Sequence, residues 1–158
     1  MSNDHTKDLG ALIARAMVGI VFVFHGAQKL FGLFGGPGLE GFGGFLQSLG
    51  VPFPALSAVL AGSAELFGGL SLLLGVGQRA IGVPLVFTML VAAFSAHTGF
   101  DVQKGGMEYP LTLGAVVAGL ALIGPGRFNA LTLVQRLRGQ PAEGQATAKA
   151  SAPEPLRV

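Results

Sequence analysis

The sequence predicts an all-α protein, a four-helix transmembrane bundle with a short interfacial segment after the first helix and a cytoplasmic amphipathic helix after the fourth. Of 158 residues, 51% are hydrophobic and only 11% are charged, and the mean hydropathy is +0.63. Soluble domains carry about a quarter charged residues, so this chain has too few charges to cover a globular surface. Four separate apolar runs approach the roughly 20 residues that a bilayer-spanning helix needs.

The first predicted span covers residues 10–31. Its apolar run is about 20 residues long, which exceeds the apolar core of a secretory signal, and it carries His25 and Lys29. It also lacks a small-x-small cleavage site. We therefore expect a retained transmembrane helix.

Three further apolar runs are predicted spans: residues 54–76, 79–97 and 108–123. Pro52 and Pro54 stand where proline is tolerated, at a helix start, and Pro84 lies near the first turn of the third span. Gly124-Pro125-Gly126 is a strong helix stop, which makes the fourth span the shortest.

Two segments outside the spans have apolar residues at helical spacing. After the first span these residues are Leu39, Phe42, Phe45, Leu46 and Leu49. They predict an interfacial segment that either caps a cavity or packs its apolar face on the bundle. Residues 128–138 alternate apolar and basic side chains, which predicts the amphipathic helix. Residues 139–158 cannot bury a core and are predicted to be a disordered tail, so the bundle domain is residues 1–138.

Basic residues gather on one predicted side of the membrane. With four spans, that side holds Lys7, Arg79, Arg127, Arg136, Arg138, Lys149 and Arg157. The other side holds Lys104 and, at its edge, Lys29. Because lysine and arginine are enriched in cytoplasmic loops, the sequence predicts a multi-pass plasma (inner) membrane protein with both termini in the cytoplasm.

The composition also excludes several functions. The chain has no cysteine, which removes disulfides, CxxC redox pairs, thiolate metal sites and covalent haem attachment. The formal net charge is only +2, so nothing supports nucleic acid as a partner. No metal site is predicted.

Ionisable residues inside the predicted spans need a partner or a function, because they are costly in a bilayer. At 100° per residue, Arg15, His25 and Lys29 share one face of the first span. Glu65 lies near the middle of the second span and has small neighbours at helical spacing, so it should point into the bundle. Either Arg15 or His25 is its expected partner, and an Arg15 to Glu65 ion pair that fixes helix register is the structural alternative to a functional role.

Polar residues from three spans are expected to converge in the outer half of the bundle. The third span ends at His97, and the fourth begins with Glu108 and Tyr109, the only tyrosine. The predicted polar cluster is His25, Gln28, Lys29, His97, Glu108 and Tyr109. Taken singly, Lys29, Glu108 and Tyr109 are also compatible with snorkelling interfacial residues. The histidines suit hydrogen bonding to a carbonyl head group or proton exchange with it.

Several ordered motifs resemble a known family over residues 9–130. They are Arg15 with Gly19, His25-Gly26-Ala27-Gln28-Lys29-Leu30-Phe31-Gly32, Leu49-Gly50-Val51-Pro52, Ala61-Gly62-Ser63-Ala64-Glu65-Leu66-Phe67-Gly68-Gly69, His97, Glu108-Tyr109 and Gly124-Pro125-Gly126-Arg127-Phe128. The chain resembles the DoxX family of small four-span membrane proteins. The family takes its name from a subunit of an archaeal thiosulfate:quinone oxidoreductase, and its relatives are associated with membrane redox complexes, quinone or catechol stress and chaperone-like roles.

The resemblance implies a quinone-linked subunit of a membrane redox complex, with quinone as the cofactor bound in the outer cluster. His25 and His97 would then hydrogen-bond the ring oxygens, with assistance from Lys29 or Gln28, while Glu65 and Glu108 would exchange protons. The expected catalytic set is therefore Glu65, His25 and His97, and the expected ligand-binding set is Arg15, Gln28, Lys29, Glu108 and Tyr109. A partner redox protein would supply the electrons, since the chain has no cysteine and no nucleotide fingerprint.

A non-enzymatic membrane anchor or assembly factor has equal support. Its buried charges would only lock the helices together, and the glycine-rich faces suit packing within the bundle and a homo-oligomer equally well. Haem b ligation by His25 and His97 and a transport role have less support, because two histidines are a common coincidence and the sequence has no obvious inverted repeat.

Overall fold

The computed structural model describes residues 3–138, and this part of the chain is all-α. Its elements are α1 (Asn3–Phe31), η1 (Leu33–Gly35), α2 (Gly38–Ser48), α3 (Pro54–Leu74), α4 (Gln78–Ala96), η2 (Val102–Lys104), α5 (Glu108–Ile123) and α6 (Ala130–Leu137). The two η elements are short 3-10 helices. The predicted disordered tail, residues 139–158, lies outside the described residues.

Most of the predicted helix boundaries agree with the structure. The bounds of α5 are those predicted, and α3 and α4 end within two residues of the predictions. The prediction was wrong at the start of α1, which begins at Asn3 rather than at residue 10. Residues 3–9 are mostly polar, so they give no sign of a span, but nothing there breaks a helix and Asp4 lies favourably in the first turn.

Three of the helices, α1, α3 and α4, are long and apolar enough to cross a membrane, as judged by length and composition. The shorter apolar helix α5 has 16 residues. At 1.5 Å per residue it is about 24 Å long, against a hydrocarbon core of about 30 Å. The residues that flank α5 would therefore have to complete a fourth crossing.

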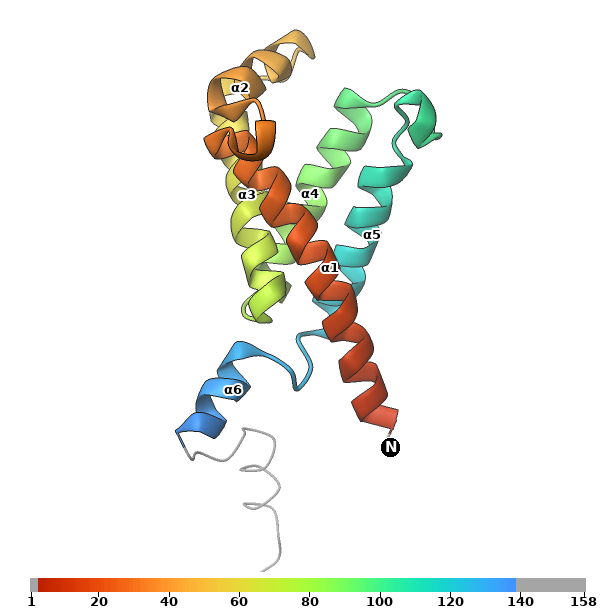
Figure 1. The fold of residues 1–158 in the computed structure, drawn as a ribbon. Coiled ribbons are helices and arrows are strands. Elements are labelled where there is room, and N and C mark those ends of the chain that lie inside the picture. Colours follow the sequence, from red (N-terminus) through yellow and green to blue (C-terminus); the bar gives the residue numbers. More distant parts are fainter. Residues whose placement is uncertain (1–2, 139–158) are drawn as a thin grey trace, which may run out of the picture.

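Helix α1 runs diagonally across the bundle and packs mainly on α3, while α4 pairs with α5 (Figure 1). At one end of the molecule lie the start of α1 and helix α6, and we call this the terminal end. At the other end α2 covers the start of α3, and η2 connects α4 to α5. The connecting segments therefore alternate between the two ends as the four-span prediction requires.

Large apolar side chains cover the outside of the helices, as expected for a surface in contact with lipid. Well-exposed examples are Ile13, Met17, Phe67, Val83, Phe87, Phe94 and Leu122. The interior holds a smaller apolar core, which consists of Val18, Phe22, Leu72, Leu85, Met89, Val117 and Leu120. Because lipid gives no hydrophobic drive for helices to associate, the bundle depends on close packing and on buried polar contacts.

Glycines let the backbones of α1 and α3 approach closely. A Cβ added at Gly26 would lie 2.5 Å from the backbone nitrogen of Leu66, and one added at Gly69 would lie 2.6 Å from that of Val23. No side chain fits at either position unless the helices move apart. This confirms the prediction that the small residues of the two spans serve helix contact.

Helix α2 packs on the bundle through only part of its apolar surface. Phe42 and Leu46 are buried against Ala58 of α3, whereas Leu39 and Phe45 remain exposed. The interfacial segment therefore forms a helix that covers one end of α3.

Candidate functional site

A buried ion pair joins α1 to α3. The ammonium nitrogen of Lys29, Nζ, lies 2.5 Å from Glu65 Oε1, and the side chain of Glu65 is 2% exposed whereas that of Lys29 is 23% exposed. The prediction that Arg15 or His25 partners Glu65 was therefore wrong. Glu65 does point into the bundle, as its small neighbours indicated.

The crossing of the two helices explains this choice of partner. Gly26 rests on Leu66, so the part of α1 beside Glu65 is the turn that follows Gly26, where Lys29 lies. Arg15 precedes Gly26 by eleven residues, which is about 16 Å along a helix. No arginine side chain spans that separation and also reaches across to Glu65.

Helix α2 lies over the ion pair. Lys29 Nζ lies 5.1 Å from the centroid of the Phe42 ring, a cation–π distance. Sequence reasoning missed this contact, because Phe42 was recognised only as part of an apolar face. Helical periodicity indicates which face of α2 is apolar, but it does not indicate which charged side chain lies under that face.

One oxygen of the Glu65 carboxylate has no hydrogen-bond partner among the residues that the structure describes. Within residues 3–138, Glu65 Oε2 is buried and makes no hydrogen bond. Tyr109 at the start of α5 lies within electrostatic range of Glu65, and its side chain is partly exposed. Glu65 therefore contacts Lys29 of α1 and keeps one acceptor without a partner in this part of the chain.

Neither histidine makes a polar contact with the ion pair in the part of the chain that the structure describes. His97 is half-buried at the end of α4, and its Nδ1 donates to the carbonyl of Ala92 at 2.8 Å, which leaves Nε2 free to accept. His25 is half-buried, with its ring against the edge of Phe24. In the described part of the chain, no hydrogen bond or ion pair joins either histidine to Glu65.

Two other residues of the predicted cluster hold loops. The side-chain amide of Gln28 donates to the carbonyl of Phe34 at 3.4 Å. Glu108 Oε1 accepts from the backbone nitrogen of Val102 at 2.9 Å and so joins the start of α5 to η2. Of the predicted cluster, Lys29 is the one member with a hydrogen bond or ion pair to Glu65 within residues 3–138. Residues 3–138 contain no group of three His, Asp or Glu side chains placed to hold a metal ion.

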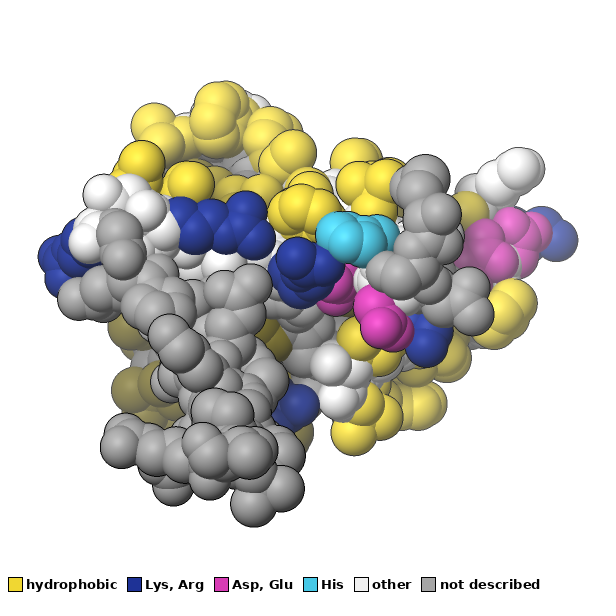
Figure 2. Space-filling model, turned by 90° about the horizontal axis from the view of Figure 1, so that it is seen from below, with side chains coloured by type: hydrophobic (Ala, Val, Ile, Leu, Met, Phe, Trp, Pro, Cys, Tyr) yellow, Lys and Arg dark blue, Asp and Glu magenta, His cyan; other side chains and the backbone are white. Residues whose placement is uncertain are grey.

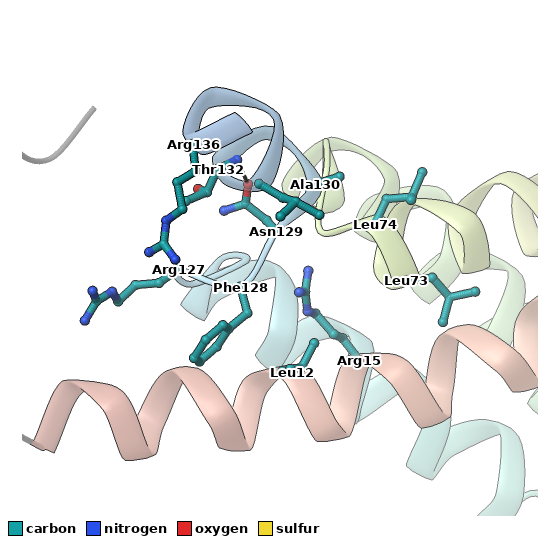
Figure 3. Close-up of a pocket in the computed structure, with 11 residues that line it drawn as sticks. Leu12, Arg15, Leu73, Leu74, Arg127, Phe128, Asn129, Ala130, Thr132 and Arg136 are labelled. Carbon is teal, nitrogen blue, oxygen red and sulfur yellow. Dashed lines mark hydrogen bonds between the residues drawn. The ribbon is translucent and has the colours of Figure 1, made fainter. Parts of the chain in front are cut away.

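Arg15 belongs to a different place, at the terminal end. It is 1% exposed and lines a cavity of about 370 Å³ between α1, the end of α3, the segment 124–129 and α6 (Figure 3). Sequence reasoning missed this cavity, since it forms only when the chain after α5 folds back across the bundle. From the sequence, Arg127 and Arg136 served only to predict the orientation of the chain in the membrane, although both line the cavity.

The comparisons with known proteins point to one family. A family model described as DoxX matches residues 10–98. The chain is 31% identical over 124 residues to a Bacillus subtilis (strain 168) protein named "Putative oxidoreductase CatD", which covers 78% of this chain and 85% of that protein.

Two Escherichia coli (strain K12) proteins are also similar. Inner membrane protein YphA is 33% identical over 91 residues, which is 58% of this chain and 61% of YphA. Inner membrane protein YqjF is 28% identical over 125 residues, which is 78% of this chain and 90% of YqjF. No solved structure matches the chain at a significant level.

Proposed function

Because this chain belongs to the DoxX family, we propose that it is a multi-pass inner membrane protein that binds a quinone head group for a membrane redox complex. The names of YphA and YqjF support the inner membrane location. The name of CatD supports the redox role. We further propose that α5 completes a fourth crossing and that both termini face the cytoplasm, in accord with the positive charges at the terminal end.

The observation that carries the quinone proposal is the half-satisfied carboxylate of Glu65. One oxygen receives the Lys29 ammonium, and the other is buried without a partner in residues 3–138. A buried acceptor of this kind is costly unless a ligand or a proton satisfies it. Lys29 offers further N–H donors beside it, so a donor and an acceptor lie together at one point of an apolar bundle.

The fit to a quinone follows from the chemistry of this pair. A quinone supplies two-electron chemistry coupled to the uptake of two protons. Lys29 would donate a hydrogen bond to a ring oxygen, and Glu65 would hold a proton at Oε2. Tyr109, His25 and the free Nε2 of His97 lie on the surrounding helices as further polar groups. The electrons would come from a partner redox protein, because this chain has no cysteine to relay them.

A second candidate function is a membrane anchor or assembly factor. The same ion pair supports it, because Lys29, Glu65 and Phe42 together tie three helices into one unit. In that case the pair has only a structural role and no small molecule binds beside it. The two candidates therefore differ in one measurable property, the binding of a quinone.

Tyrosine fluorescence can report that binding at the proposed site. The chain contains no tryptophan and one tyrosine, and this tyrosine, Tyr109, lies within electrostatic range of Glu65. We expect a short-chain ubiquinone or menaquinone analogue to quench the emission of the purified protein in a saturable way. Glu65→Gln should raise the apparent Kd for the quinone at least tenfold, because it replaces the carboxylate by an amide and so changes the hydrogen-bonding groups at the site.

The matched control is Glu40→Gln, which changes an exposed carboxylate on α2 at the same end of the molecule. It should leave the apparent Kd unchanged. Quenching of the wild-type protein that rises linearly with quinone, with no saturation, would overturn the quinone proposal and favour the anchor. If Glu65→Gln does not fold, His97→Ala provides the second test of a localised site, with the same tenfold threshold.

A further inference from the structure

Arg15 is a buried cation that has no acidic partner among residues 3–138. Its side chain is 1% exposed, and within residues 3–138 its Nε and Nη1 are buried and make no hydrogen bond. Lys29 has the nearby carboxylate of Glu65, but no carboxylate neutralises Arg15 in the described residues. A buried, unpaired guanidinium is unfavourable, so the site favours any anion that reaches it.

The guanidinium of Arg15 points into the cavity at the terminal end. It lies against Gly75, the residue that ends α3, where an added Cβ would collide with Nη1. Figure 3 shows the side chain extending from α1 toward Asn129 and the start of α6. The cavity measures about 370 Å³, which exceeds the volume of a single water molecule about tenfold. There is therefore room for an anion beside the buried nitrogens.

Two more arginines line the same cavity. Arg127 and Arg136 are both exposed, so they stand at its mouth while Arg15 forms its floor. Figure 2 shows basic side chains gathered on this end of the molecule. The Nη1 atom of Arg127 lies 2.9 Å from His5 Nε2, and Figure 3 shows this side chain directed away from Arg15.

Among the described residues, no acidic side chain lines the cavity to neutralise this positive charge. Asn129 accepts from the backbone nitrogen of Thr132 and donates to the carbonyl of Gly126, so its side chain is already used. Asp8 lies close to Gly126 but does not line the cavity. The N-terminus of α6 opens at the same place and adds its partial positive charge.

We propose that this cavity binds a phosphate group, with Arg15 as the buried anchor and Arg136 at its mouth. The planar guanidinium suits paired hydrogen bonds to phosphate oxygens, and two arginines match the charge of a phosphate better than that of a halide. The apolar part of the wall, formed by Leu12, Leu73, Leu74 and Phe128, accepts a ligand with an apolar portion. The phosphate group could therefore come from an anionic phospholipid or from a free phosphate in water.

The experiment measures binding to the full chain purified in a mild detergent. Native mass spectrometry would follow titration with phosphatidylglycerol, and with a glucosyl diacylglycerol that has the same chains without phosphate. In parallel, thermal unfolding would be measured in inorganic phosphate and in chloride at equal ionic strength. Preference for phosphatidylglycerol alone would identify a lipid head group, and a gain of about 5 °C in phosphate over chloride would identify a free phosphate.

Three variants locate the site. Arg15→Gln should weaken binding of the active probe at least tenfold, and Arg136→Gln should weaken it several-fold. Arg138→Gln is the matched control, because it removes the same charge from an exposed position at the end of α6 that does not line the cavity. Without a phosphate probe, Arg15→Gln should also unfold at a higher temperature than the wild-type protein, since it relieves an unpaired buried charge.

Two results would overturn the proposal. One is equal response to all probes in the wild-type protein, and the other is equal loss of binding in Arg136→Gln and Arg138→Gln, which would indicate attraction by surface charge alone. If Arg15→Gln fails to fold, the comparison of Arg136→Gln with Arg138→Gln still shows whether phosphate binds in the cavity. None of these measurements depends on quinone binding at the opposite end.

Discussion

Lys29 of α1 and Glu65 of α3 form an ion pair whose acidic partner is almost fully buried, and the pair lies beside the close contact of Gly26 with Leu66. The contact neutralises a charge that a bilayer-spanning helix could not carry alone. It also fixes how far α1 slides along α3, because Glu65 meets only the turn of α1 that contains Lys29. Register and charge are thus set by the same two residues.

The first prediction concerns the energetic coupling of this pair. In a double-mutant cycle with Lys29→Gln and Glu65→Gln, each single substitution should lower the free energy of unfolding. The double substitution should lower it by less than the sum of the two single effects. We expect a coupling of about 1 to 3 kcal/mol, since Glu65 is buried and the bond is charge-assisted. Reversible unfolding in mixed micelles measures it.

The control cycle combines Arg15→Gln with Glu65→Gln. Arg15 lies about 16 Å along α1 from the crossing point, so the two changes should add without coupling. A coupling energy in the Arg15 cycle as large as in the Lys29 cycle would contradict the helix crossing described above.

Much of the fold could be predicted from the sequence, because apolar length and helix-stopping residues are local signals. The bounds of α5 follow from the polar loop before Glu108 and from the Gly124-Pro125-Gly126 stop after it. The start of α1 was missed for the complementary reason: a helix that continues into water no longer shows an apolar run. The tilt of α1 across α3 has no signature in the periodicity of either helix.

The site was predictable only in part, for the same reason. The small residues around Glu65 showed that it faces another helix, but its partner depends on where α1 crosses α3. Sequence order placed Arg15 and His25 on either side of the expected depth, whereas the crossing at Gly26 selects Lys29. The cavity around Arg15 needs residues more than a hundred positions apart, and no local pattern brings these together.

A second prediction tests the contact at Gly26. Gly26→Ala should lower the free energy of unfolding by about 1 to 3 kcal/mol, because the new methyl group would lie 2.5 Å from the backbone nitrogen of Leu66. Gly10→Ala on the same helix is the control, since a Cβ there meets nothing within 4 Å. The control should be neutral or slightly stabilising, as alanine favours helix over glycine. Equal effects of the two changes would show that α1 and α3 do not touch at Gly26.

A third prediction concerns the link between α4 and α5. Gln78 is 1% exposed, and its side-chain nitrogen donates to the carbonyl of Leu120 at 2.7 Å. Gln78→Leu should lower the free energy of unfolding by about 1 kcal/mol. The loss is modest because the carbonyl of Leu120 also accepts a hydrogen bond from the backbone nitrogen of Gly124. The substitution also removes the side-chain oxygen of Gln78, which is buried without a hydrogen-bond partner in the described residues. Thermal unfolding in detergent checks this, with Gln47→Leu on the exposed side of α2 as the control. A stabilising Gln78→Leu change would mean that the bond contributes less than the unpaired oxygen costs.

The last prediction concerns the crossing of α5, the helix that is shorter than the others. The chain has no cysteine, so single cysteines report sidedness without background. Suitable exposed positions are Lys7, Ser48, Lys104 and Arg138. With a membrane-impermeant maleimide added to spheroplasts, Ser48→Cys and Lys104→Cys should react at once, whereas Lys7→Cys and Arg138→Cys should react only after the membrane is opened.

Each outcome of this labelling has a distinct meaning, because Lys104 and Arg138 lie on opposite sides of α5 in the chain. If these two positions label together while Ser48 and Lys7 still differ, α5 does not cross and the bundle has three spans. If all four positions react in the reverse order, the crossing holds but the orientation deduced from the basic residues is inverted. The expected order requires that the residues flanking α5 extend its length of about 24 Å to match a core of about 30 Å. Local thinning of the bilayer around this short helix would reduce the extension needed.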